Sequence, residues 1–361
     1  MSSIRSTLRD RPALRGALFV PSVVALIFSL FNLSAAPDPA RIAGQSPIAV
    51  VNDDTGLPFP PINMGARMIA GLSGRLPMPV QTFATEDEAR AALQAETVVA
   101  VLHLPAEFSR SIAGTDAVPL SLITSGSLTA GQGQMAGALP GMIESGISSA
   151  ILSIRLAMAQ GRMPDMTPPV ALTAEVVNPA ANPAARMAPF VAGFVTALAA
   201  MVGAIIGYTG TRGLPGRIGG VLRTLFPVVA LPIAAVVLTV LIVGFAGGDA
   251  WGLWVSVTGL GIALGWLFAG ALALFGWASL VVIVPLVFYQ AVLGGAQVPM
   301  AAAPDWLQFL APLHMDAIGA HFRTLIIAGP HAFPWALAGG AAVLGLAMIW
   351  LRALILAGRR A

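Results

Sequence analysis

The stretch that decides the fold is residues 225–274, LFPVVALPIAAVVLTVLIVGFAGGDAWGLWVSVTGLGIALGWLFAGALAL, in which Asp249 is the only charged residue. The next charge is Asp305. One helical crossing of a bilayer needs about 20 apolar residues, so the 80 residues from 225 to 304 predict three crossings, with turns near Gly247 and Gly276. The whole chain agrees, because 57% of its 361 residues are hydrophobic and only 10% are charged, against about 25% in soluble domains. We therefore expect a polytopic membrane protein.

Apolar runs on both sides of this stretch raise the expected number of transmembrane helices to six. The first run, 16–36, follows four arginines and ends in Ser34-Ala35-Ala36, so a cleaved signal peptide is the alternative interpretation. Its length and the spans that follow favour a retained helix. The predicted spans are residues 16–36, 189–208, 225–246, 253–274, 278–296 and 333–354.

The arginines indicate how these helices are oriented, because cytoplasmic loops carry an excess of basic residues. Ten arginines lie in residues 1–15, in residues 209–224 and after residue 351. The loops on the other side, 247–252 and 297–332, contain one arginine, Arg323. This distribution predicts a multi-pass protein of the bacterial cytoplasmic membrane, with both termini in the cytoplasm and residues 37–187 outside.

Residues 37–187 differ in composition, with twelve acids and eight arginines, and are numerous enough to form their own core. Thr85 is the expected N-cap of a helix that reaches about Glu96, and Glu88 holds the capping-box position. A short helix is expected after Pro105, and a long one over 129–160, bent at Pro140. Short buried strands are predicted at residues 47–51, 98–104, 118–123 and 171–177.

This alternation predicts an extracytoplasmic α/β or α+β domain inserted between the first and second transmembrane helices. The expected organisation is a cytoplasmic segment at 1–15, a first transmembrane helix at 16–36, the extracytoplasmic domain at 37–187, and a five-helix transmembrane domain at 188–361.

The composition excludes several chemistries. All 19 basic residues are arginine and cysteine is absent, so the chain has no lysine for a phosphate-binding loop and no thiolate for metal binding or catalysis. The motifs G-x-S-x-G and S-x-x-K of serine hydrolases are also missing. The arginines lie at the ends of apolar runs rather than on one solvated face, which argues against nucleic-acid binding. We expect no catalytic residue, cofactor or metal site, and hence no enzyme.

Two polar clusters leave a metal site as an open alternative. Asn52–Gly56 (NDDTG) has the residue types of a calcium loop but neither the ligand spacing nor the closing glutamate, so a capped turn after a strand is favoured. His314 and His321 are seven residues apart near Asp316. Without a matched third ligand, they are better interpreted as the edge of an interfacial helix.

The loop 297–332 is the candidate outer gate. Four prolines divide it into amphipathic pieces, which are expected to form a re-entrant segment in the outer membrane interface. Trp306, Phe309 and Phe322 are expected to face lipid or neighbouring helices. Asp316 and Arg323 are expected to share a face near water.

Other polar residues are weaker candidates for function. Five of them could line a transport pathway or make contacts between helices, namely Tyr208, Thr239, Thr258, Tyr289 and Gln290. The arginines of the segment 209–224 are the candidate contacts for a cytoplasmic partner, namely Arg212, Arg217 and Arg223.

Three groups of motifs carry a resemblance to a known family. They are IAVVNDDTG at 48–56, the run 83–109 that ends in LPAEFS, and PDWL at 304–307, which Pro312-Leu313 and Phe322-Arg323 follow. In this order and spacing, the chain resembles the ABC type-2 permease superfamily over nearly its whole length. The form VVNDDTG is most similar to the phage infection protein branch of that superfamily.

The resemblance implies a transmembrane permease subunit that acts in the lipid bilayer as a homodimer or with a paired permease. Such a subunit exports its substrate when a separate ATP-binding subunit hydrolyses ATP. Family members coupled to an ATPase often have an acid-rich segment between the second and third spans, whereas residues 209–224 contain no acid. The alternative is therefore a membrane-anchored interaction or receptor protein, similar to the phage infection protein, whose extracytoplasmic domain binds a partner without transport.

Overall fold

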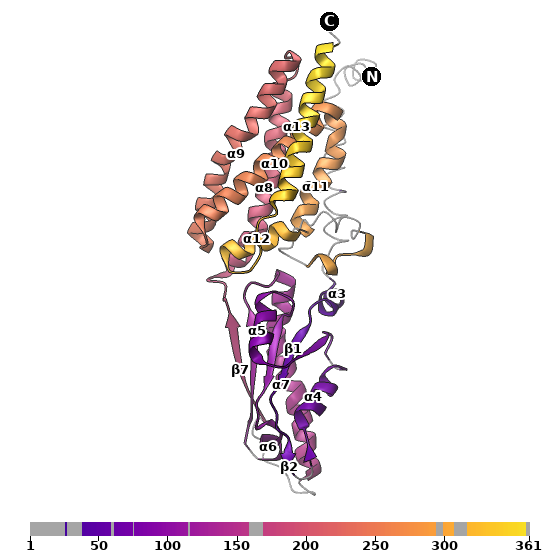
Figure 1. The fold of residues 1–361 in the computed structure, drawn as a ribbon, viewed down its shortest axis with the longest axis vertical. Helices are drawn as coiled ribbons and strands as arrows, with labels where there is room; N and C mark the ends of the chain where they lie inside the picture. The colour runs from indigo at the N-terminus through magenta and orange to yellow at the C-terminus, as the bar shows by residue number, and fades with distance from the viewer. Residues whose placement is uncertain are drawn as a thin grey trace, which may run out of the picture.

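The computed structural model has an α/β unit (residues 38–177) and a helical bundle (residues 183–358), stacked end to end along the long axis (Figure 1). The α/β unit contains both sheet and helix, whereas the described part of the bundle is helical. The structure describes residue 26 and residues 38–58, 61–74, 76–114, 116–158, 169–293, 299–306 and 316–358.

A five-stranded sheet with the order β4-β1-β5-β6-β7 forms the centre of the α/β unit. Neighbouring strands are parallel except for β5 and β6. The four strands expected from the sequence are confirmed, but β4 was not predicted, because it is a half-exposed edge strand without a continuous apolar run. The bounds are β1 Ile48–Asn52, β2 Leu57–Pro58, β3 Pro61–Ile62, β4 Val80–Phe83, β5 Ala100–Leu104, β6 Val118–Ser125 and β7 Val170–Val177.

Helices cover both faces of this sheet. In β1, Ile48 and Val50 pack in the core that includes α7, whereas Ala49 and Val51 pack against α5. The predicted cap of α5 is confirmed, because Thr85 Oγ1 accepts a hydrogen bond from the backbone N–H of Glu88 at 3.2 Å. The bounds are α3 Pro39–Gly44, α4 Met64–Leu72, α5 Glu86–Gln94, α6 Phe108–Ala113 and α7 Ala130–Met158.

Among the described residues, five helical stretches are long and apolar enough to cross a membrane by length and composition. One of them belongs to α7, which instead uses Leu139, Ile143, Ile147 and Ile151 to cover the sheet. The other four lie in the bundle. The stretches are Ala130–Leu156, Pro183–Gly210, Gly216–Ala246, Ala250–Phe288 and Trp335–Gly358.

The last five predicted spans coincide with α8, α9, α10, α11 and α13, and the first span lies outside the described residues except for Leu26. Helices α8, α9, α10 and α13 are longer than the predicted apolar runs, whereas the described part of α11 is shorter. For example, α8 starts where Asn182 caps it by accepting a hydrogen bond from Ala185 N–H at 3.0 Å. The bounds are α8 Pro183–Gly210, α9 Gly216–Ala246, α10 Ala250–Phe275, η1 Gly276–Ser279, α11 Leu280–Leu293, η2 Met300–Ala302, α12 Asp316–Ile326 and α13 Trp335–Gly358.

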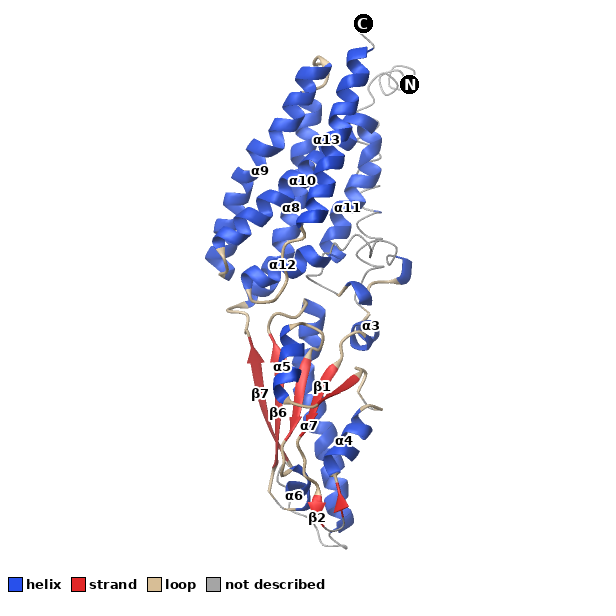
Figure 2. Ribbon diagram, in the orientation of Figure 1, coloured by secondary structure: helices blue, strands red, loops and turns tan. Residues whose placement is uncertain are grey.

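The bundle has two different ends (Figure 2). The α8–α9 turn and the end of α13 lie far from the α/β unit. At this end the guanidinium carbons of Arg212 and Arg223 lie 5.4 and 5.6 Å from the ring centroid of Tyr208. The other end meets the α/β unit, and α12 lies there between the two parts.

Candidate functional site

The candidate site is the junction between the α/β unit and the bundle, which is centred on α12. One side of α12 is apolar and packs on the bundle, where Ile318, Phe322 and Ile326 belong to the buried core. Phe322 is completely buried and approaches α8 near Gly193. The apolar positions at steps of four residues therefore fix α12 to the bundle, which leaves Arg323 to face the α/β unit.

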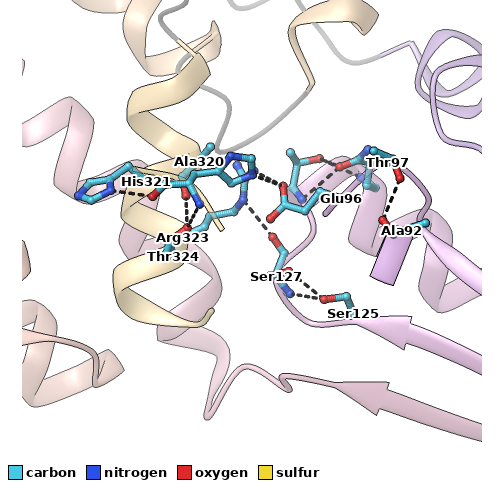
Figure 3. Close-up of polar contacts among 12 residues, drawn as sticks. Ala92, Glu96, Thr97, Ser125, Ser127, Ala320, His321, Arg323 and Thr324 are labelled. Atoms are coloured by element: carbon cyan, nitrogen blue, oxygen red, sulfur yellow. Dashed lines mark hydrogen bonds and ion pairs between the residues drawn. The ribbon is translucent and has the colours of Figure 1, made fainter. Parts of the chain in front are cut away.

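Arg323 joins the two parts of the chain by a buried ion pair (Figure 3). Its Nη2 donates to Glu96 Oε2 at 2.9 Å, and its Nε donates to the carbonyl oxygen of Ser127 at 3.0 Å. The side chains of Arg323 and Glu96 are 5% and 11% exposed. A buried ion pair that loses one partner leaves an uncompensated charge, at a cost of about 3–5 kcal/mol. We call the contacts of Glu96, Ser127 and Arg323 the buried tether.

Local structure in the α/β unit holds the partners of Arg323 in place. Glu96 follows α5 in a left-handed conformation, with φ 57°, and its N–H donates to Leu93 O at 3.1 Å. The next residue, Thr97, donates from both its N–H and its hydroxyl to Ala92 O. Ser127 is held by the Ser125 hydroxyl, which accepts a hydrogen bond from Ser127 N–H at 3.2 Å. Both partners thus lie on turns whose shape is fixed by hydrogen bonds within the α/β unit.

The loop after α12 returns to the same carboxylate. His331 Nε2 lies 3.2 Å from Glu96 Oε2, at ion-pair distance but without hydrogen-bond geometry. The Thr324 hydroxyl accepts from His331 N–H at 3.2 Å. Between them, Gly329 has φ 155°, and a Cβ there would crowd Thr324 Oγ1. This glycine therefore lets the loop pass close to Glu96.

His321 joins α12 to the bundle rather than to a metal. Its Nε2 lies 2.8 Å from Ser256 Oγ on α10, and its Nδ1 lies 3.0 Å from the carbonyl oxygen of His331. Both ring nitrogens are thus engaged by protein groups. The other histidine of the predicted pair, His314, lies outside the described residues.

A second link joins the two parts at the surface. Arg41 in α3 donates two parallel hydrogen bonds to Asp305, both of 3.0 Å, and a further one to Ala303 O at 3.2 Å. The hydrogen bonds and charge of Arg41 lower the pKa of Asp305. The Asp305 side chain is 86% exposed, so water competes for it. We call this contact the outer tether.

The structure revises part of the predicted outer gate. Arg323 does not remain near water, because Glu96 lies close enough to neutralise its charge in a buried position. It therefore does not share a water-facing side with Asp316, which is half-buried. Phe322 packs against the bundle as expected, and Trp306 is 45% exposed. Phe309 lies outside the described residues.

The other candidates are not brought together in one place. Thr239 in α9 and Thr258 in α10 each have a buried hydroxyl that makes no hydrogen bond to any described residue. Tyr208 lies at the remote end, where Trp277 meets its ring edge-on at 5.7 Å. The side chains of Tyr289 and Gln290 lie outside the described residues.

The arginines proposed as partner contacts lie around the α8–α9 turn. Arg212 and Arg217 are exposed. Arg223 is half-buried and donates from Nε to Thr211 Oγ1 at 2.8 Å. The three side chains thus place positive charge at the end of the bundle remote from the α/β unit, and two of them are open to a partner.

The sequence analysis missed Glu96, Ser127 and His331. Glu96 was assigned only to the end of a helix, and Ser127 had no assigned role. One signal could have indicated a partner: Arg323 is the only arginine in the amphipathic loop 297–332, and a buried arginine needs a carboxylate. That signal does not identify which of the acids in residues 37–187 is the partner.

The NDDTG motif forms a structural turn. Burial alone would favour the neutral form of Asp54, but hydrogen bonds from the N–H and hydroxyl of Ser109 and from the N–H groups of Gly65 and Gly56 outweigh it and lower its pKa. Asp54 is 7% exposed. Protein donors occupy its carboxylate, in agreement with a capped turn after β1.

Comparison with known proteins places the chain in a class and then in a family. The described helices fit a multi-pass membrane protein, and the match to known proteins identifies a transport permease. Residues 16–211, more than half of the chain, match the model of the ABC-2 family transporter protein family, so the chain belongs to that family. Members of this family are membrane subunits of transporters and are usually not catalytic.

One similar solved structure is a domain assigned to an ABC type-2 transporter from Thermotoga maritima MSB8. The two chains are 16% identical, and the match covers 37% of this chain and 86% of that one, with a TM-score of 0.28. This likeness is too low to support an argument about fold or function. No curated protein matches the sequence.

Proposed function

We propose that this chain is the permease subunit of an ABC-type exporter, works as a homodimer or with a paired permease, and is powered by a separate ATP-binding subunit. Membership of the ABC-2 family supports a permease. The observation that carries the proposal further is the buried tether. It joins α12, at the outer end of the bundle, to the α/β unit through Glu96 and Arg323.

The proposed topology has six spans, with residues 16–36 as the first, both termini in the cytoplasm and residues 37–187 outside the bacterial cytoplasmic membrane. The arginines support this orientation, because Arg212, Arg217, Arg223 and Arg352 lie at the end of the bundle remote from the α/β unit. The chain has no cysteine, so single-cysteine variants give a clean test.

In spheroplasts, an impermeant maleimide should label Asp87→Cys, on the exposed side of α5, but should label Arg212→Cys only after the membrane is permeabilised. Asp87 and Arg212 are both exposed in the structure, so access to the reagent is decided by the membrane. Labelling of both positions in intact spheroplasts would contradict the topology.

In this proposal, α12 acts as the outer gate because it contacts both parts of the molecule. Phe322 and His321 hold it to α8 and α10, and Arg323 holds it to the α/β unit. A rearrangement of the bundle that moves α12 must therefore move the turns that carry Glu96 and Ser127, or break the tether. Asp316, the first residue of α12, together with Trp306 and Phe309 before it in the sequence, completes the proposed gate.

The ATP-binding subunit would bind at the arginine end. Arg212 and Arg217 are exposed there and offer positive charge to an acidic partner surface. Affinity purification of the full chain from its native membrane should recover an ATP-binding protein. The variant Arg212→Glu/Arg217→Glu should reduce this recovery strongly, whereas Arg110→Glu, on the exposed side of α6 in the α/β unit, should leave it unchanged.

The alternative function is an interaction or receptor protein that does not transport, as in the phage infection protein branch. One observation favours it: only residues 211–215 connect α8 to α9, and they contain no acid. This short turn gives an ATPase little surface to bind. Recovery of an extracellular partner with no ATP-binding protein would support this alternative and contradict the exporter.

A further inference from the structure

The α/β unit contains a groove far from the junction, between α4 and α7. Its volume is about 650 Å³, which lies within the range of about 300–1,000 Å³ that is typical of small-molecule sites. In Figure 1 both helices lie on the same side of the α/β unit. The groove is lined by Met64, Arg67, Met68, Gly71, Leu72, Leu76, Met142, Ser145, Gly146, Ala150 and Ile154.

The lining is almost entirely aliphatic. Methionine and leucine dominate it, no aromatic ring contributes among the described residues, and Ser145 already donates its hydroxyl to Met142 O at 3.2 Å. Methionine adapts its shape to flexible apolar ligands. Apart from Arg67 at its edge, the described lining offers neither rings for stacking nor free hydrogen-bonding groups, so it is poorly suited to sugars, nucleobases or aromatic ligands.

Small residues give the groove its depth. An added Cβ would meet nothing within 4 Å at either Gly71 on α4 or Gly146 on α7. The space over these glycines is therefore open and is not filled by a neighbouring side chain. Met142, at the edge of this space, is 41% exposed, so its side chain adds apolar surface to the open side of the groove.

Among the lining residues that the structure describes, Arg67 is the only charged one. It is exposed, and no acidic side chain among the described residues forms an ion pair with it. A guanidinium presents several N–H donors that suit a carboxylate or phosphate. The groove thus combines an apolar interior with one positive charge at its edge.

We propose that this groove binds an anionic amphiphile with a single hydrocarbon chain. The chain lies along the methionines and over Gly71 and Gly146, and the acidic group pairs with Arg67. This binding site goes beyond the proposed export function and does not depend on it. It is also connected to the junction, because α7 starts at Ala130, three positions after Ser127, whose carbonyl oxygen binds Arg323.

The test uses the full chain in nanodiscs of zwitterionic lipid, with a diazirine-bearing C16 fatty acid as the probe. After photolysis, peptide mapping should find the crosslinks in α4 and α7, and unlabelled palmitate should compete for them. Labelling confined to the membrane helices, or labelling of α4 and α7 that unlabelled palmitate does not reduce, would overturn the proposal.

Matched variants separate the groove from general effects on folding. Gly146→Leu should fill the groove and abolish labelling, and no neighbour lies within 4 Å to clash with it. Gly137→Leu, on the same helix but outside the groove, also meets nothing within 4 Å and should label normally. Both variants should keep the thermal transition of the parent, which is followed by circular dichroism because the α/β unit contains no tryptophan.

The proposed pairing of the ligand's acidic group with Arg67 is tested separately. Arg67→Gln should weaken competition by palmitate about tenfold, as expected for the loss of one charge-assisted hydrogen bond, whereas Arg110→Gln should not change it. Palmitate methyl ester should compete as weakly with the parent chain as palmitate does with Arg67→Gln. Equal competition by the acid and its ester in the parent would refute an anionic ligand.

Discussion

The α/β unit and the helical bundle differ in which side chains they bury. The α/β unit buries its large apolar side chains, and Phe108 on α6 is 0% exposed. The bundle buries many alanines and glycines and turns large side chains outward, so that Phe245 at the end of α9 is 72% exposed. The difference indicates two solvents: water around the first and lipid around the second.

This difference changes what stabilises each part. In water, the removal of apolar surface drives folding at about 25 cal/mol per Å². Between helices in lipid this driving force is absent, and close packing of small residues takes its place. Gly270 in α10 and Gly345 in α13 provide such a contact, because a Cβ on either would overlap the other helix. The two parts therefore respond differently to the same kind of substitution.

The largest effect is expected from Gly345→Leu. Its side chain would collide with the backbone of Trp266 and Leu267 on α10, so the bundle should fail to assemble, with a loss of about 5 kcal/mol or more. Fluorescence-detected size exclusion in detergent should show aggregate or no protein. Gly339→Leu, on the same helix with nothing within 4 Å, is the control and should elute as the parent does.

The next effect tests the buried tether between the two parts. Arg323→Gln leaves the Glu96 carboxylate buried without its main counter-charge, which should cost about 3–5 kcal/mol and loosen the junction. Limited proteolysis should then cut between β7 and α8, and export should fall. The double variant Arg323→Gln/Glu96→Gln removes the unpaired charge and should recover part of the stability. If Arg323→Gln resists protease as the parent does, the tether does not hold the two parts together.

A smaller effect, confined to the α/β unit, is expected from Asp54→Asn. Its carboxylate accepts four hydrogen bonds from Ser109, Gly65 and Gly56, and weakening them should cost about 2–3 kcal/mol. Hydrogen exchange of β1 and β5 in the full chain should accelerate, while exchange in α8–α10 should not change. Asp53→Asn is the control, because that side chain is half-exposed.

The carboxylate of Asp54 also predicts that the stability of the α/β unit depends on pH. The pKa of Asp54 is lower in the folded chain than its ordinary value of 3.8, so its stabilisation is fully present above that value. It is lost as the pH falls through the lower, folded pKa. Hydrogen exchange should therefore be slower in the parent than in the Asp54→Asn variant at pH 5, and this difference should shrink below pH 4.

The smallest effect is expected at the outer tether. Asp305 is 86% exposed, so Asp305→Asn should change stability by only about 0–1 kcal/mol, and any change should fade at high salt. The thermal transition of Asp305→Asn, compared with that of Arg323→Gln at the same salt concentration, measures how much each tether contributes to stability. An effect of Asp305→Asn as large as that of Arg323→Gln would contradict the assignment of the buried tether as the main link.

Local patterns account for what could be predicted from the sequence. The apolar runs, Thr85 as a cap and the strand β1 each depend on residues that are close together in the sequence, so their spacing is visible in the chain. Strand β4 and helix α4 were missed, because a half-exposed edge strand and a short helix leave no long apolar run.

The sequence by itself determined that the chain has a membrane part and a separate α/β part, because hydrophobicity and charge are summed over short segments. Only the tertiary structure decided that Arg323 is buried and paired with Glu96, which lies 227 positions away. It also decided that α4 and α7 leave a groove between them. Contacts between segments that are distant in the sequence depend on how whole helices and strands pack, and the local spacing of residues does not reveal them.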